Sequence, residues 1–191
     1  MKKMWVLAIL LLILSGVVLG KTLLVPAGAN SNMYVSMGDF LLKQGYTDAA
    51  EKAYLRAIVL DSDNMFAYNN LGAFYREKNP ILSEENYLKA LKIDPEYAVA
   101  RNNLALLYNS LGRYSEAAAN LQMLADSQPE NKQYVYDLAI NLAKKFYYEG
   151  RSIADLNLAL SAFKKAYSLD PSFGHSLENI KVLEEIRRMV E

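Results

Sequence analysis

Apolar residues along most of the chain recur with the spacing of amphipathic helices. After residue 30, apolar or small side chains return at i, i+3, i+4, i+7 and i+8, a spacing that places them on one helical face. The first such set is Tyr34, Met37, Gly38, Leu41 and Leu42. Short breaks near Gly45 and Gly112 separate one helical stretch from the next. The pattern therefore predicts a succession of paired helices.

The same landmarks return at nearly constant intervals. Met37-Gly38 recurs as Leu71-Gly72, Leu104-Ala105 and Leu138-Ala139, at steps of 34, 33 and 34 residues. The small residue of each pair lets the second helix of a unit approach the first closely. Three units close on prolines, which stop the second helix, at Pro95, Pro129 and Pro171. Equal steps of this length predict a stacked array of helix pairs.

This pattern resembles the tetratricopeptide repeat, an antiparallel helix pair of 34 residues with aromatic, Leu-Gly, Tyr, Ala, aromatic, Ala and Pro landmarks. In the second unit these landmarks are Tyr68, Leu71-Gly72, Tyr75, Tyr87, Ala90 and Pro95. The resemblance covers residues 31–171. It implies an all-α fold, a right-handed α-solenoid of about four helix pairs with a C-terminal cap helix. The expected boundaries are residues 30–64, 65–97, 98–131 and 132–171 for the four repeats and 172–191 for the cap.

Repeated aromatic positions indicate helix–helix packing for most of the tyrosines. The tyrosines expected in the core are Tyr34, Tyr54, Tyr68, Tyr75, Tyr87 and Tyr108.

Two units depart from the common length. The second is one residue short around residues 79–81, which predicts a trimmed turn between its helices. The fourth is eight residues long, about two helical turns, and these are predicted to extend its first helix over residues 144–151. Gly150 would end that helix, and Ser152 with Asp155 resembles a capping box for the next one.

An apolar leader precedes the repeats. Residues 4–19 form an uncharged run of sixteen behind Lys2 and Lys3, a pattern that indicates export. Residues 23–25 can lengthen the run, so the favoured interpretation is a retained membrane anchor over residues 1–29, with an N-terminal apolar helix. The repeats would then lie on the exported side, periplasmic or extracellular. In the alternative, a signal peptide is cleaved after the small-x-small sequence at residues 27–29, and the protein is secreted or periplasmic.

The composition limits which kinds of binding and catalytic site the protein can have. The 191 residues include 21 basic and 21 acidic side chains, and this balance disfavours binding to nucleic acid. There is no cysteine, and His175 is the only histidine, which excludes disulfides, thiol catalysis and most metal sites. The chain has no P-loop or nucleophile-elbow motif. The sequence thus predicts a protein that is not an enzyme and needs no cofactor or metal.

Polar residues at equivalent positions of successive units suggest a binding surface. In the resembled family the first helices line the concave surface, where an asparagine amide can donate to and accept from a peptide backbone. A polar contact between helices, or a solvated face, is the alternative. The candidate partner-binding residues are Asn69, Asn70, Asn102, Asn103, Arg76, Tyr136 and Asp137. Val35 and Asp39 stand where some relatives carry a basic residue and an asparagine to clamp a terminal carboxylate, so that clamp is not expected.

The leading hypothesis is an exported, membrane-anchored scaffold or assembly factor that holds a partner peptide in the concave groove. The alternative is a self-associating structural subunit of an envelope complex, and a homo-oligomer therefore stays open at this point.

Overall fold

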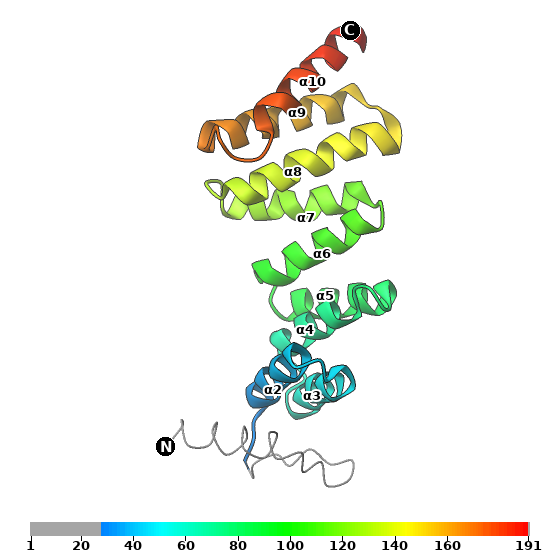
Figure 1. Cartoon of the computed structure of the whole chain (residues 1–191), viewed down its shortest axis with the longest axis vertical. Helices are drawn as coiled ribbons and strands as arrows, with labels where there is room; N and C mark the ends of the chain where they lie inside the picture. Colours follow the sequence, from blue (N-terminus) through cyan, green and yellow to red (C-terminus); the bar gives the residue numbers. More distant parts are fainter. Residues whose placement is uncertain (1–27, 191) are drawn as a thin grey trace. The chain divides into compact units, whose positions relative to one another are not determined.

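The repeats form an all-helical stack (Figure 1). The computed structural model describes residues 28–190, and these contain nine α-helices, one short π-helical segment and no strand. The predicted all-α fold is confirmed. The anchor and the apolar helix predicted for residues 1–29 fall outside the described residues, except for the last two positions. No helix between residues 28 and 190 has the length and apolar character needed to cross a membrane.

The helices form four pairs and a final single helix. Their bounds are α2 Ser31–Lys43, α3 Thr47–Leu60, α4 Met65–Tyr75, α5 Pro80–Ile93, α6 Ala98–Ser110, α7 Tyr114–Ser127, α8 Lys132–Lys145, η1 Phe146–Gly150, α9 Ile153–Leu169 and α10 Ser176–Val190. Each helix packs against the next one in sequence. The first helices α2, α4 and α6 also contact one another in turn, so they form a shared surface, called here the first-helix surface.

Small residues on the first helices allow the close approach that the repeat pattern predicts. A Cβ atom added to Gly72 would lie 2.6 Å from two ring carbons of Tyr87, and one added to Gly38 would overlap the ring of Tyr54. In the third unit Ala105 replaces the glycine, and the facing position holds the smaller Leu121. The six tyrosines expected in the core are all buried or half-buried, which confirms their packing role.

The extra length of the fourth unit is shared between its two helices. The first helix continues from α8 through the π-helical segment η1 to Gly150, and α9 has 17 residues compared with 14 in α7. Ser152 caps α9 by accepting a hydrogen bond from the amide of Ala154 at 3.2 Å. Asp155 instead pairs with Lys145 at 2.7 Å. Placing all eight residues in the first helix was therefore wrong, as was the capping box.

The missing residue of the second unit shortens a helix and leaves the turn intact. Helix α4 has 11 residues compared with 13 in α2 and α6, whereas residues 76–79 form a turn longer than residues 44–46 or 111–113. The start of α5 is fixed locally, because Asn79 accepts from the amide of Leu82 at 3.2 Å and Pro80 occupies the first helical position. The predicted trimmed turn was wrong for this reason.

The apolar core is continuous only in the C-terminal half of the array. One cluster of buried side chains extends from Ala105 on α6 to Leu183 on α10. The N-terminal half is filled by three smaller, separate clusters. The polar contacts between the first units are therefore important for joining them.

Candidate functional site

A ladder of polar side chains crosses the first-helix surface from α2 to α6. Asn70 donates from Nδ2 to Oδ1 of Asp39 at 2.7 Å. Asn69 donates to Oδ1 of Asn70 at 3.0 Å, and Asn103 donates to Oδ1 of Asn69 at 3.0 Å. The structure thus brings three of the candidate asparagines together, and their amides link first helices of neighbouring units.

A pocket of about 370 Å³ opens beside this ladder, between α2 and α4. Its lining combines apolar side chains with amides, a hydroxyl and one carboxylate. The lining residues are Asn32, Val35, Ser36, Asp39, Phe66 and Asn70. Of the residues proposed from the sequence, only Asn70 lines it.

Asp39 is held in place by two donors. Its Oδ1 accepts from the hydroxyl of Tyr54 at 2.8 Å as well as from Asn70. Burial, together with the hydrogen bond to Asp39, raises the pKa of Tyr54 well above its usual value, so the phenol stays a donor at physiological pH. The carboxylate therefore has a fixed direction at the edge of the pocket.

Asn102 and Arg76 stand apart from the ladder. Asn102 is half-buried on α6. Arg76 is exposed just past the end of α4, where its positive charge opposes the rise that burial causes in the pKa of Tyr87.

Tyr136 and Asp137 belong to the C-terminal half of the array. The Tyr136 ring packs edge-on against Phe163 and Phe173, with ring centroids 5.8 and 5.5 Å away. Asp137 accepts from Gln133 at 2.8 Å, and burial raises its pKa despite that bond. Neither residue lines the pocket between α2 and α4.

A second polar ladder joins α6 to α8, and the sequence did not suggest it. Asn109 donates to Oδ1 of buried Asn141 at 2.6 Å and accepts from Nζ of Lys144 at 3.0 Å. These residues fall 32 and 35 positions apart, close to one repeat period.

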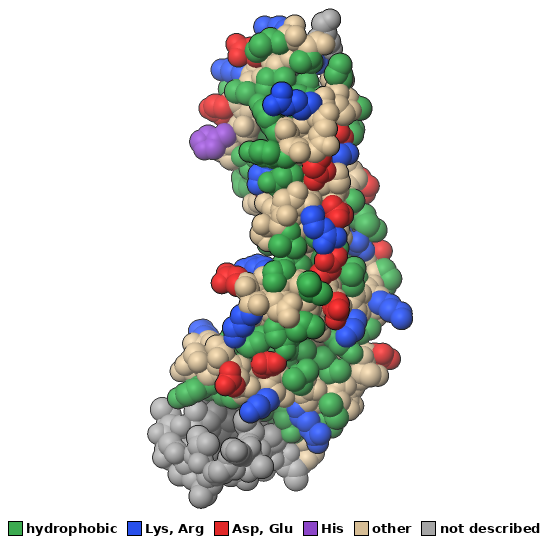
Figure 2. Space-filling view, turned by 90° about the vertical axis from the view of Figure 1, so that its right-hand side faces the viewer, with side chains coloured by type: hydrophobic (Ala, Val, Ile, Leu, Met, Phe, Trp, Pro, Cys, Tyr) green, Lys and Arg blue, Asp and Glu red, His purple; other side chains and the backbone are tan. Residues whose placement is uncertain are grey.

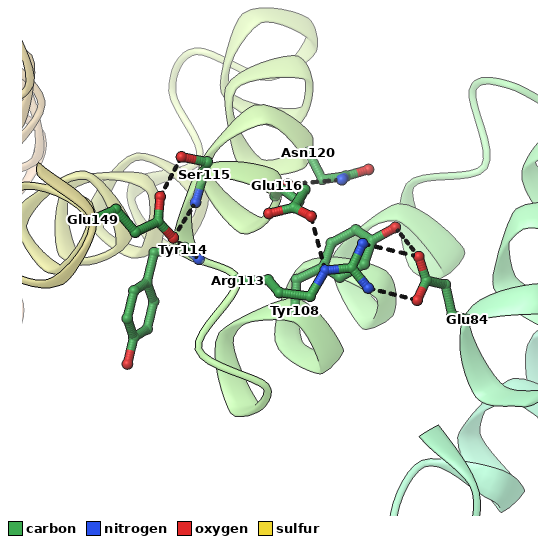
Figure 3. A network of polar contacts seen from close by, with 8 residues as sticks. All are labelled: Glu84, Tyr108, Arg113, Tyr114, Ser115, Glu116, Asn120 and Glu149. Atoms are coloured by element: carbon green, nitrogen blue, oxygen red, sulfur yellow. Dashed lines mark hydrogen bonds and ion pairs between the residues drawn. The ribbon is translucent and has the colours of Figure 1, made fainter. Parts of the chain in front are cut away.

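A charged clasp joins the second and third units (Figure 3). Arg113 donates to both oxygens of Glu84, at 2.6 and 3.1 Å, and to Glu116 at 2.8 Å. The Tyr108 hydroxyl also donates to Glu84 at 2.8 Å. The Arg113 hydrogen bonds and that of Tyr108 hold the pKa of Glu84 below its usual value, although burial opposes this. Burial and the contact with Glu84 raise the pKa of Tyr108 to about 12.

The preceding junction repeats the tyrosine–carboxylate part of the clasp. Tyr75 donates to Glu51, and these residues are 24 positions apart, as are Tyr108 and Glu84. At the junction between the third and fourth units, the two equivalent positions, which are also 24 residues apart, hold Ala118 and Leu142, and both are buried. This equal spacing is the signal by which sequence reasoning could have found the clasp.

The π-helical segment caps a helix of the preceding unit (Figure 3). Glu149 accepts from the amides of Tyr114 and Ser115 at 2.6 and 3.1 Å, and from the Ser115 hydroxyl. Burial opposes ionisation of Glu149, yet these bonds hold its pKa below the usual value. Next to it, the rings of Tyr114 and Tyr148 lie 5.5 Å apart, and Tyr148 remains 75% exposed.

Charges of both signs are mixed on the surface seen in Figure 2. Basic and acidic side chains alternate along this face, with apolar side chains between them. Among residues 28–190, no group of three or more His, Asp or Glu side chains is arranged to hold a metal ion.

Comparison with known families agrees with this geometry. The stacked helix pairs define a helical repeat protein. Residues 31–64 and residues 86–119 each match a family model described as a tetratricopeptide repeat, so the chain carries tetratricopeptide repeats.

Several solved protein structures are similar to this chain in fold. YrrB, described as a tetratricopeptide repeat protein with an unusual peptide-binding site, has 22% identity and a TM-score of 0.69 over 83% of this chain and 78% of its own. MamA has 21% identity and a TM-score of 0.69 over 85% of this chain and 87% of its own. PilF of Pseudomonas aeruginosa has 22% identity and a TM-score of 0.63 over 83% of this chain and 69% of its own. No match was found among curated proteins.

Proposed function

We propose that this protein is a non-enzymatic scaffold or assembly factor that holds a peptide segment of a partner protein on its first-helix surface. The observation that carries the proposal is the pocket of about 370 Å³ between α2 and α4. It joins the apolar side chains of Val35 and Phe66 to the amide of Asn70, and sites of this mixed character suit a peptide. The solved structure of YrrB, with its described peptide-binding site, supports the same function by analogy of fold.

Site-directed photo-crosslinking in native membranes tests this function. A photo-reactive residue at Ser36, which is exposed and lines the pocket, should capture a partner protein. The matched control is the same residue at Lys52, exposed on the second helix α3. Equal capture at both positions, or capture only at Lys52, would contradict binding on the first-helix surface.

We also propose that the protein is exported and anchored by residues 1–29. The support is the uncharged run of residues 4–19 behind Lys2 and Lys3. The expected result is fractionation with membranes and a mature chain that keeps the leader. N-terminal sequencing that begins at Asn30 would replace the anchor with a cleaved signal peptide.

A second candidate function, self-association, is favoured by the last helix. Helix α10 buries Ile180 and Leu183, whereas Val182 is 50% and Met189 75% exposed. Light scattering over a range of concentrations should then show a dimer that Val182→Lys disrupts. A monomer at every concentration would remove this candidate.

A further inference from the structure

The pocket between α2 and α4 has a negative charge in its lining. Among the described residues that line it, Asp39 is the only ionisable one. Within residues 28–190, no ion pair joins Asp39 to a lysine or arginine; Lys43, one helical turn further along α2, forms none either. Other carboxylates of the array, such as Glu84 and Asp155, do have cationic partners.

The contacts of Asp39 leave one oxygen for a ligand. Both donors, Tyr54 and Asn70, bind Oδ1. Within the described part of the chain, Oδ2 accepts no hydrogen bond, and the side chain is exposed at the pocket. The carboxylate is thus oriented by neutral donors while its charge is not neutralised, which favours a cationic ligand.

An aromatic wall stands beside this carboxylate. The Phe66 ring is 43% exposed and lines the pocket. It is supported edge-on by Tyr97, with ring centroids 5.6 Å apart and an interplanar angle of 82°. The face of an aromatic ring attracts a lysine or arginine side chain. Burial raises the pKa of Tyr97, and the negative charges of Asp39 and Asp94 add to that rise.

We propose that the pocket between α2 and α4 binds a lysine or arginine side chain of the partner peptide. The cationic group lies against Oδ2 of Asp39, and its aliphatic stem lies along Val35 and the Phe66 ring. This inference rests on the proposed peptide-binding function and adds the chemical class of the peptide: a basic segment.

The test uses the full-length chain in detergent solution and a positional-scanning library of short peptides with blocked ends. We expect one library position to select lysine and arginine over norleucine and glutamate. For the best lysine peptide, Asp39→Asn should weaken binding roughly 1.5- to 5-fold, the range of a solvent-exposed ion pair. Phe66→Leu should weaken it roughly 2- to 5-fold through loss of the cation–π contact. The loss of peptide affinity caused by Asp39→Asn should be smaller at high ionic strength.

Matched variants separate charge from folding. In Asp39→Asn the new amide keeps an oxygen that can accept from Tyr54 and Asn70, so this variant should retain the wild-type circular dichroism spectrum and melting temperature. Glu185→Gln removes the same charge from an exposed position on α10 and should leave binding unchanged.

The outcomes distinguish this inference from the proposed function. If peptides bind without a preference for lysine or arginine, or if Asp39→Asn leaves peptide affinity as unchanged as Glu185→Gln does, the proposed site for a basic side chain is wrong. The proposed peptide-binding function would still stand. If no peptide in the library binds at all, both are overturned.

Discussion

Substitution of Gly72 by alanine tests the packing at the centre of the second unit. The new Cβ would lie 2.6 Å from Cδ1 and Cε1 of Tyr87, well inside van der Waals contact. Tyr87 is fully buried, so its ring has no open space into which it can move. The third unit holds the sterically compatible pair Ala105 and Leu121 at the same positions.

Two opposing effects set the expected magnitude. Overpacking a core costs about 1–3 kcal/mol, whereas replacing a glycine inside a helix by alanine gains about 1 kcal/mol. Gly72→Ala alone should therefore lower the free energy of unfolding by up to about 2 kcal/mol. In a Tyr87→Leu background the clash is gone, and the same substitution should stabilise by about 1 kcal/mol. The coupling energy between the two sites is then about 1–3 kcal/mol.

Urea denaturation of the four proteins of this double-mutant cycle, followed by circular dichroism, measures the coupling. The matched control is Gly150→Ala, because an added Cβ there meets nothing within 4 Å. That control should be neutral or slightly stabilising. A coupling energy near zero, or a loss at Gly150 equal to that at Gly72, would refute the proposed close approach of α4 and α5.

Three further predictions concern the contacts between units. Because the pKa of Glu84 is lower in the folded state, the wild-type protein should be more stable than Glu84→Gln above the unfolded-state pKa of about 4.3. Denaturation at several pH values should show that this stability difference disappears as the pH falls through the lower folded-state pKa. Glu149→Ala should cost about 1 kcal/mol, as loss of a helix cap does, and should speed hydrogen exchange at the amides of Tyr114 and Ser115, which mass spectrometry detects. Ultraviolet titration should show tyrosinate that forms only near pH 12, and Tyr108→Phe should reduce that fraction.

Periodic and local features of this fold were predictable from the sequence. The glycines at Gly38 and Gly72 mark close helix contacts because only a residue without a side chain fits under the facing ring. The prolines and Ser152 mark helix ends because capping depends on a few neighbouring residues. Such signals need no knowledge of the folded chain.

Features that depend on the path of the backbone were not predictable. The Glu149 cap joins residues 34 and 35 positions apart and depends on a π-helical turn, for which the sequence carries no specific signal. The sequence shows the asparagines as a repeated polar set. Whether their amides bond to one another or to a peptide is decided by the spacing of α2, α4 and α6, and that spacing emerges only on folding.

The uneven core has a consequence for how the array opens. In a linear array each interface acts as a separate link, and the chain opens first where its links are weakest. The α2–α5 segment is joined by small apolar clusters and by a part-buried hydrogen bond between Tyr75 and Glu51, while α7–α10 shares one apolar cluster. The pocket therefore lies in the segment for which we expect the lowest free energy of local unfolding. A ligand bound there should slow hydrogen exchange throughout α2–α5 and leave exchange in α9 and α10 unchanged.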